Sequence, residues 1–160
     1  MLTQENEKSI QISMIYLKDS DINSIIERHM RQSLEGKCDN FGFIEPKSLQ
    51  LLSKSLGKVL TVDGHSMVEF KVKYKFNSLY PSPGDKYICT VESITKMGLI
   101  CYLREAASLD ESPVIIIIPQ VFLGDHDLKS FSIGDTCEVE VMESRIKYKN
   151  RQIQSVAKIV

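Results

Sequence analysis

The sequence has no long apolar run and almost no excess of charge. Its most apolar run, Val114 to Ile118, is far shorter than the roughly 20 residues that a helix needs to cross a bilayer, so no membrane span is expected. The N-terminus, Met1 to Glu7, has neither a basic start nor an apolar core, and nothing in it suggests export. With 20 Lys and Arg against 21 Asp and Glu, polyanion binding would require a local basic patch.

The cysteines form no pattern that is typical of a metal or redox site. Cys38, Cys89, Cys101 and Cys137 occur without a C-x-x-C pair and without a close histidine partner. Zinc sites and redox pairs are usually built on such short spacings. We therefore expect reduced thiols that pack as small hydrophobic side chains, with no bound metal and no cofactor.

No group of residues predicts a catalytic centre. Asp125-His126-Asp127 looks like a base with orienting carboxylates, but side chains adjacent in one loop rarely converge on one proton. We interpret it as a solvated turn. Gly36-Lys37 and Gly57-Lys58 lack the spacing of a phosphate-binding loop. We therefore expect a protein that is not an enzyme.

The first half of the chain predicts a strand and a helix. Ile10 to Leu17 alternates as a strand would, and its inward face would consist of Ile10, Ile12, Met14 and Tyr16. A helix should follow the capping oxygens of Ser20 and Asp21 and end at Gly36, where a left-handed cap is expected. Its apolar stripe consists of Ile22, Ile25, Ile26, Met30 and Leu34.

An aromatic cluster and further strands follow the helix. Phe41-Gly42-Phe43 places a glycine between two rings, which allows a tight backbone path while the rings pack or protrude. A strand-like stretch from Ser48 to Leu60 leads to Asp63-Gly64, a hairpin turn signal. The next segment alternates cleanly, and its buried face would consist of Val68, Phe70, Val72, Tyr74 and Phe76.

Two prolines and a glycine between Tyr80 and Gly84 predict a domain boundary, with domains at 1–80 and 81–160. Beyond it, five short strands are expected: 87–94, 98–103, 113–119, 134–141 and 151–160. Val114 to Ile118 should be buried on both faces. The fold class is therefore α+β, with a small N-terminal α/β domain followed by a five-stranded OB-fold β-barrel.

The clearest basic patch lies between the last two expected strands. Arg145, Lys147, Lys149 and Arg151 alternate around Tyr148, which could present charge to phosphate and a ring to a base. A solubilising turn is the alternative. Weaker stacking candidates are Tyr102 and Tyr87, and Lys71, Lys73 and Lys75 form a second stripe that a solvated strand face explains.

Several stretches, in this order and spacing, resemble the seventh subunit of eukaryotic RNA polymerase II and its archaeal counterpart. They are Leu34 to Ile44 after the helix, Val72 to Lys75, Pro81 to Asp85 and Val91 to Leu99. The resemblance covers roughly Ile10 to Val141 and depends on these stretches occurring together in one chain. The tip is shorter than in the family, and the part after Asp110 lacks its signature residues. Such divergence suits a subunit from a large DNA virus or a distant eukaryotic lineage.

The resemblance implies a non-catalytic polymerase subunit that forms the stalk with a small partner subunit. The N-terminal domain would be a truncated RNA-recognition-like fold. Its tip, Glu35 to Ile44, would dock on RNA polymerase core subunits near the clamp through Gly36, Phe41, Gly42 and Phe43. The OB-fold would contact nascent single-stranded RNA.

The resemblance also implies a location and a partner surface. The protein would work in the nucleus, or in the cytoplasm or virion if a virus encodes it. The small partner would cover apolar surface around Ile10 to Tyr16 and the domain junction.

Two alternatives remain open. Phe41 and Phe43 could simply close the core of their own domain. The whole chain could instead be a free-standing OB-fold RNA-binding factor in translation or RNA processing, which has no need of a docking tip.

Overall fold

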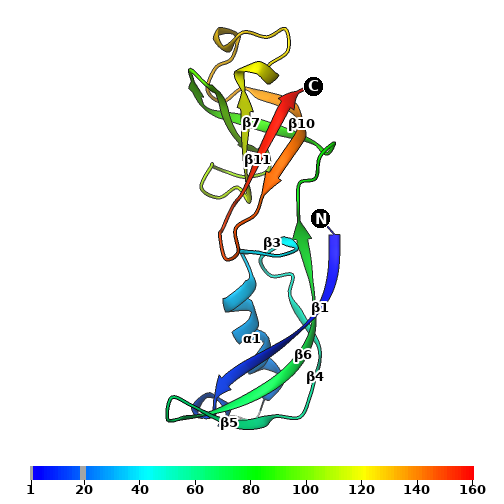
Figure 1. The fold of residues 1–160 in the computed structure, drawn as a ribbon, viewed down its shortest axis with the longest axis vertical. Helices are drawn as coiled ribbons and strands as arrows, with labels where there is room; N and C mark the ends of the chain where they lie inside the picture. The colour runs from blue at the N-terminus through cyan, green and yellow to red at the C-terminus, as the bar shows by residue number, and fades with distance from the viewer. Residues whose placement is uncertain (1, 19–20) are drawn as a thin grey trace. The chain divides into compact units, whose positions relative to one another are not determined.

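The computed structural model describes residues 2–18 and 21–160, which form two compact units (Figure 1). The first unit runs up to Gly36 and continues from Ile44 to Leu79. The second contains Tyr80–Val160 together with the short segment Lys37–Phe43. The division after Leu79 lies at the proline-rich break, whereas nothing in the sequence separated the segment Lys37–Phe43 from its neighbours.

The first unit is built around one long strand, β6 (His65–Leu79). Its antiparallel partners include β1 (Leu2–Ser13), β4 (Gln50–Lys54) and β5 (Lys58–Val62). Asp63 and Gly64 both have positive φ and join the paired residues Val62 and His65, so the predicted two-residue hairpin turn is confirmed. The alternating face of β6 is also confirmed, since Val68, Phe70, Val72, Tyr74 and Phe76 are all buried.

The single α-helix among the described residues, α1 (Ile22–Leu34), matches its prediction closely. The side chain of Asp21 caps it by accepting a hydrogen bond from the backbone N–H of Ser24. Of the predicted stripe, Ile26, Met30 and Leu34 join the core of the unit and Ile25 packs against it, whereas Ile22 is 37% exposed. Gly36 follows the helix with φ of +70°, as the left-handed cap required. The other expected capping residue, Ser20, lies outside the described residues.

The prediction for the first strand is wrong at both ends. β1 begins at Leu2 and ends at Ser13, and Met14–Leu17 form the 3₁₀ turn η1. Ile10 and Ile12 are buried as expected, but Met14 and Tyr16 are exposed because the backbone leaves the sheet before it reaches them. The expected strand over 48–60 is likewise two strands, β4 and β5, separated at 55–57.

The second unit contains a closed five-stranded barrel. Its strands are β7 (Lys86–Thr95), β8 (Gly98–Leu103), β9 (Val114–Pro119), β10 (Thr136–Arg145) and β11 (Ile153–Ile159). They close in the order β10-β11-β9-β8-β7, with β10 paired to β7. β11 pairs parallel with β9 and the other pairs are antiparallel, which is an OB-like arrangement. The five expected strands are therefore confirmed.

Smaller elements complete the described chain. The 3₁₀ turns η2 (Gln120–Phe122) and η3 (Leu128–Ser130) lie between β9 and β10. The short strands β2 (Cys38–Asp39) and β3 (Gly42–Ile44) form a hairpin. The described structure is thus mostly β with one helix, and no helix in it is long and apolar enough to cross a membrane.

Inside the barrel, alternate residues of each strand fill the core. On β9, Val114, Ile116 and Ile118 are at most 1% exposed, but Ile117 is 36% exposed. The expectation that this strand is buried on both faces is therefore wrong. A strand of a closed barrel turns only every second side chain inward, so the intervening isoleucines lie on the outer surface.

Candidate nucleic-acid interface

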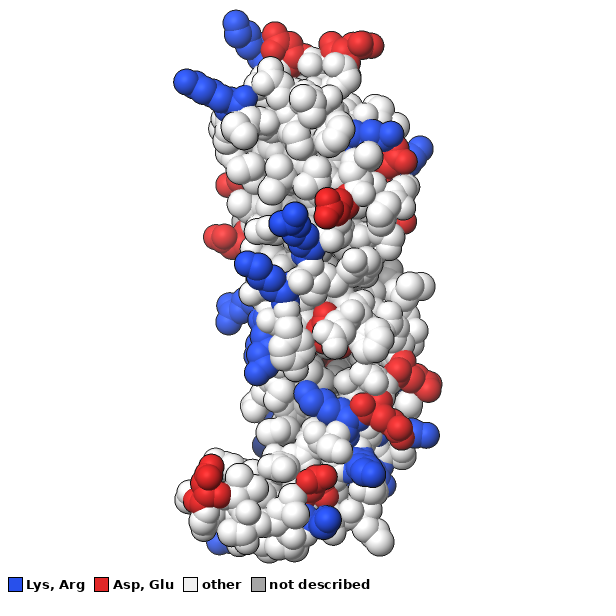
Figure 2. All heavy atoms as spheres, in the orientation of Figure 1, with Lys and Arg blue, Asp and Glu red and all other residues white. Residues whose placement is uncertain are grey.

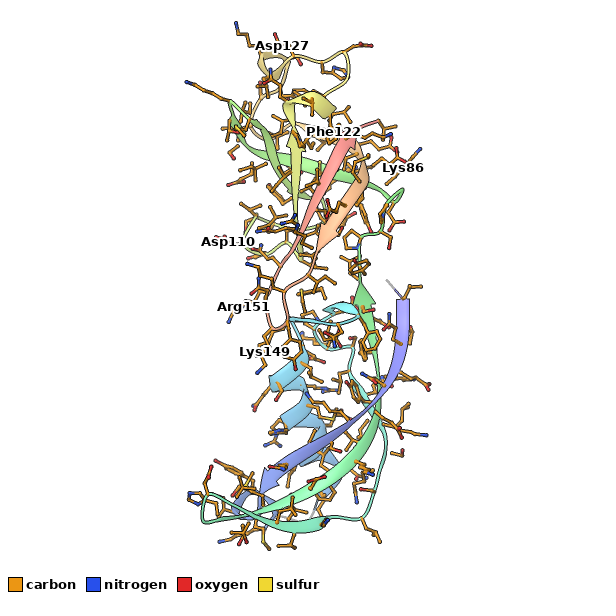
Figure 3. The ribbon with its side chains drawn as sticks, viewed as in Figure 1. Lys86, Asp110, Phe122, Asp127, Lys149 and Arg151 are labelled. Carbon is orange, nitrogen blue, oxygen red and sulfur yellow. The ribbon has the colours of Figure 1, made fainter. Side chains whose placement is uncertain are left out.

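The basic loop between β10 and β11 is exposed. Lys147, Tyr148, Lys149 and Arg151 all present their side chains to solvent, and Tyr148 is 56% exposed. The tip is a tight turn in which the backbone N–H of Asn150 donates to the carbonyl oxygen of Lys147 at 3.0 Å. Lys149 adopts φ of +66° within it. Figure 3 labels Lys149 and Arg151 on this loop, and Figure 2 shows Lys and Arg side chains gathered on the same face.

The base of the loop is fixed to the barrel. The Gln152 side-chain amide donates to the carbonyl oxygens of Leu109 and Ser112, at 2.6 and 3.0 Å. The backbone N–H of Ile153 donates to the carbonyl oxygen of Pro113 at 2.9 Å. Because these bonds hold the end of the loop, the basic tip projects from an ordered base.

The β2–β3 hairpin pairs with this loop. The N–H of Cys38 donates to the carbonyl oxygen of Asn150 at 2.6 Å, and the N–H of Lys149 donates to the carbonyl oxygen of Cys38 at 2.8 Å. The structure therefore brings together two predicted sites that are more than a hundred residues apart in the sequence.

The predicted docking residues have different environments. Phe41 is 47% exposed, and its N–H donates to Asp39 Oδ1 at 2.7 Å. Gly42 and Phe43 are buried. Gly36 belongs to the first unit, where its N–H donates to the carbonyl oxygen of Ile44 at 2.9 Å. Of the four, only the Phe41 side chain offers apolar surface for a partner.

Cys38 has a structural rather than a chemical role in the hairpin. Burial raises the pKa of its thiol to about 11, and the charge of the adjacent Asp39 adds to the effect. The thiol is therefore protonated near neutral pH and is not a nucleophile. What the residue contributes is its backbone, which is bonded to the basic loop.

The strand register places Tyr102 in line with Arg145 across the outer face of the barrel. Arg145 is paired with Gln154, Gln154 with Ile115, and Ile115 with Tyr102. Adjacent strands lie about 4.8 Å apart, so Arg145 and Tyr102 are separated by roughly 14 Å, about two nucleotides of extended strand. Tyr102 is half-buried, and its position lies outside the barrel core.

The next row of the same face is apolar. Val156 is paired with Ile117, and Ile117 with Ile100. All three are partly exposed. The outer surface of β8, β9 and β11 thus combines isoleucines and one tyrosine with the basic loop at its margin. In OB-type barrels the face of the second and third strands, here β8 and β9, and the loop between the fourth and fifth strands commonly bind oligonucleotides.

Charges around the loop are only weakly neutralised by the chain itself. Arg145 Nε lies 4.0 Å from Glu143 Oε1, and both side chains are largely exposed, so solvent screens this pair. Lys149 Nζ lies 5.7 Å from the centroid of the Tyr148 ring. A lysine over the ring leaves its other face open for a base.

The remaining sequence candidates lie elsewhere. Tyr87 on β7 is half-buried, and burial together with the charge of Asp85 raises its pKa. Lys73 on β6 lies 3.8 Å from Glu7 of β1, as expected of a solvated strand face. Residues 125–127 are exposed, and Asp127 caps η3, which agrees with a solvated turn.

The barrel contains a cluster of thiols that was not predicted from the sequence. The sulfur atoms of Cys89, Cys101 and Cys137 all lie within 4.8 Å of one another. Spacing along the chain did not indicate this, because the three residues come from three strands. The available signal was strand alternation: Cys89 shares the inward face of β7 with Val91, and Cys137 shares that of β10 with Val139.

No protein-family model matches the chain, and no curated protein matches it. Among solved structures, it is similar to the uncharacterized protein MJ1198 from Methanocaldococcus jannaschii. The identity is 21%, the TM-score is 0.41, and the match covers 51% of this chain and 96% of that one. A likeness at this level carries no argument about the function of the chain.

Proposed function

We propose that this chain is a non-catalytic subunit of a multisubunit DNA-directed RNA polymerase, and that its barrel contacts nascent single-stranded RNA. The proposed RNA contact is supported by one observation: paired residues run across the outer face of the barrel from Tyr102 to Arg145, at the edge of the basic loop. A strand of RNA on this face would stack bases on Tyr102 and Tyr148 and place phosphates near the lysines.

The proposed role in RNA polymerase is based on a resemblance to the stalk subunit family. The segment Leu34–Ile44 and the later segments named above carry that resemblance. In this proposal the first unit is the truncated RNA-recognition-like domain. Its single helix and its sheet support that assignment. Phe41 is the docking anchor, since a half-exposed aromatic ring on a fixed hairpin suits a hot spot in a partner's pocket.

The small stalk partner would lie on the first unit. A groove of about 670 Å³ there is lined by four apolar residues, Ile12, Ile15, Tyr16 and Ile25, and by five polar ones, Asp21, Ser24, Arg28, His29 and Gln32. Ile15 and Tyr16 are 63% and 66% exposed. These two exposed apolar side chains support the expected contact around Ile10 to Tyr16.

The second candidate is a free-standing RNA-binding factor. One observation favours it: Gly42 and Phe43, two of the four predicted docking residues, are buried. The hairpin could then serve only to hold the basic loop. The RNA-binding face would be the same in both cases, so RNA binding alone cannot distinguish them.

A pull-down distinguishes the two functions. Tagged wild-type chain should recover the large polymerase subunits from cells of its source, and Phe41→Ala should lose them while keeping its RNA affinity. Tyr148→Ala is the matched control, because it should lose RNA affinity and keep the polymerase subunits. Recovery of ribosomes or RNA alone would instead support the free-standing factor.

A further inference from the structure

Three cysteine thiols meet inside the barrel, on one side of its core. Cys89 lies on β7, Cys101 on β8 and Cys137 on β10. Cys89 and Cys137 are directly opposite each other in the β7–β10 pair, and their sulfur atoms are 3.4 Å apart. Cys101 is opposite Val91, the next inward residue of β7, which places its thiol diagonally across from Cys89.

The cluster is buried but can be reached from solvent. Cys89 and Cys101 are fully buried, whereas Cys137 is partly exposed. An ion could therefore enter past Cys137 without opening the barrel. The fourth cysteine, Cys38, lies in the β2–β3 hairpin and is not part of the cluster.

We propose that Cys89, Cys101 and Cys137 bind one zinc ion as three thiolates. Zinc–sulfur bonds of about 2.3 Å and tetrahedral angles require sulfur atoms roughly 3.8 Å apart. The cluster has one separation of 3.4 Å and all separations within 4.8 Å. Small side-chain rotations would therefore complete the site, and the strands would keep their register.

Charge favours a divalent ion over a monovalent one. Three thiolates carry three negative charges, so zinc leaves one uncompensated charge in the barrel and Cu⁺ leaves two. Each uncompensated buried charge is unfavourable. Three protein ligands leave a fourth zinc position, and the exposed side of Cys137 allows water to fill it.

Cys137 is the partly exposed member of the cluster, so its sulfur is the one that an incoming ion would reach first. Zinc binds all three cysteines as thiolates, so three thiol protons leave to solvent as three zinc–sulfur bonds form. The bound ion would cross-link β7, β8 and β10.

Cobalt titration of the reduced full-length chain tests the site. Co²⁺ should give a thiolate-to-cobalt charge-transfer band that saturates at one equivalent, and Zn²⁺ should abolish it. Cys137→Ser should weaken binding by more than about 10-fold, whereas Cys38→Ser, the same change at a buried cysteine outside the cluster, should leave it unchanged. Absence of the band in folded wild-type chain, or equal affinity in Cys137→Ser, would overturn the proposal.

A second measurement needs no variant. Zinc should slow alkylation of Cys137 in the wild-type chain, because a metal-bound thiolate is a poor nucleophile. It should also raise the thermal unfolding temperature, because the ion binds only the folded state. If zinc changes neither the alkylation rate nor the unfolding temperature, the three thiols are only small packing side chains and the metal site does not exist.

Discussion

The backbone N–H of Lys149 donates a hydrogen bond to the carbonyl oxygen of Cys38 at 2.8 Å. This bond joins the β2–β3 hairpin to the turn that presents Tyr148 and the lysines. Together with the anchoring of Gln152 at the base of the loop, it holds the basic turn from two directions. A binding loop that is already ordered loses less conformational entropy when it meets its ligand.

Tyr148→Ala should weaken the binding of single-stranded RNA by about 1–3 kcal/mol, because a stacked base would lose its aromatic platform. Fluorescence anisotropy with a labelled oligouridine at fixed salt measures the change. Tyr16→Ala is the matched control, since Tyr16 is an exposed tyrosine of the first unit. Equal losses in the two variants would show that the loop is not the binding site.

Replacing Lys147 and Lys149 with glutamine should reduce the salt dependence of RNA binding. Each phosphate contact on a single strand contributes about −0.7 to the slope of log K against log salt, so two lost contacts should reduce the slope by about 1.4. The control is the double replacement of Lys71 and Lys73 on β6. An unchanged slope in the loop variant would mean that these lysines do not contact phosphate.

Gly98→Ala should destabilise the barrel by about 3 kcal/mol or more. Gly98 has φ of +147°, and an added Cβ would clash with the carbonyl oxygen of Ile118 on the neighbouring strand. Gly134→Ala is the control: its φ is +92°, but nothing lies within 4 Å of the added atom. Denaturant unfolding should show a loss of only about 1 kcal/mol there, and a similar loss in both variants would contradict the close approach at Gly98.

The Asp21 carboxyl should titrate below its ordinary pKa of 3.8, because it accepts hydrogen bonds from the hydroxyl and the N–H of Ser24. A depressed folded pKa means that this stabilisation is complete above the unfolded value and is lost as the pH falls through the folded value. Carboxyl NMR titration measures it. Ser24→Ala should move the pKa back towards 3.8, and an Asp21 that titrates at 3.8 in the wild-type chain would contradict the capping geometry.

Local patterns predicted the strands that are apolar on one face. The alternation on β6 and the Asp63-Gly64 turn carry their own signals, because burial and positive φ each restrict residue type. The N-terminal half of β1 has no such signal. Its residues are mostly polar. Glu5 and Glu7 favour a strand here only because they lie opposite Lys75 and Lys73 on β6.

In the candidate site, too, only the features that are local in the sequence could be predicted. The basic loop was visible in the sequence because its charges and its tyrosine are contiguous. The pairing of Cys38 with Lys149 could not be predicted, because backbone hydrogen bonds between distant segments do not depend on the side-chain pattern. The alignment of Tyr102 with Arg145 depends on the parallel pairing of β11 with β9, which no local stretch encodes.

The most direct test of the RNA-binding face is to map it residue by residue. Backbone amide NMR of the full chain, titrated with a short single-stranded oligoribonucleotide, should show shifts at Tyr102, Ile115 and Ile117 and through the loop from Arg145 to Arg151. The strands β4 and β5 of the first unit should not respond. Shifts confined to the first unit, or none at saturating oligonucleotide, would contradict the assignment of RNA binding to the outer face of the barrel.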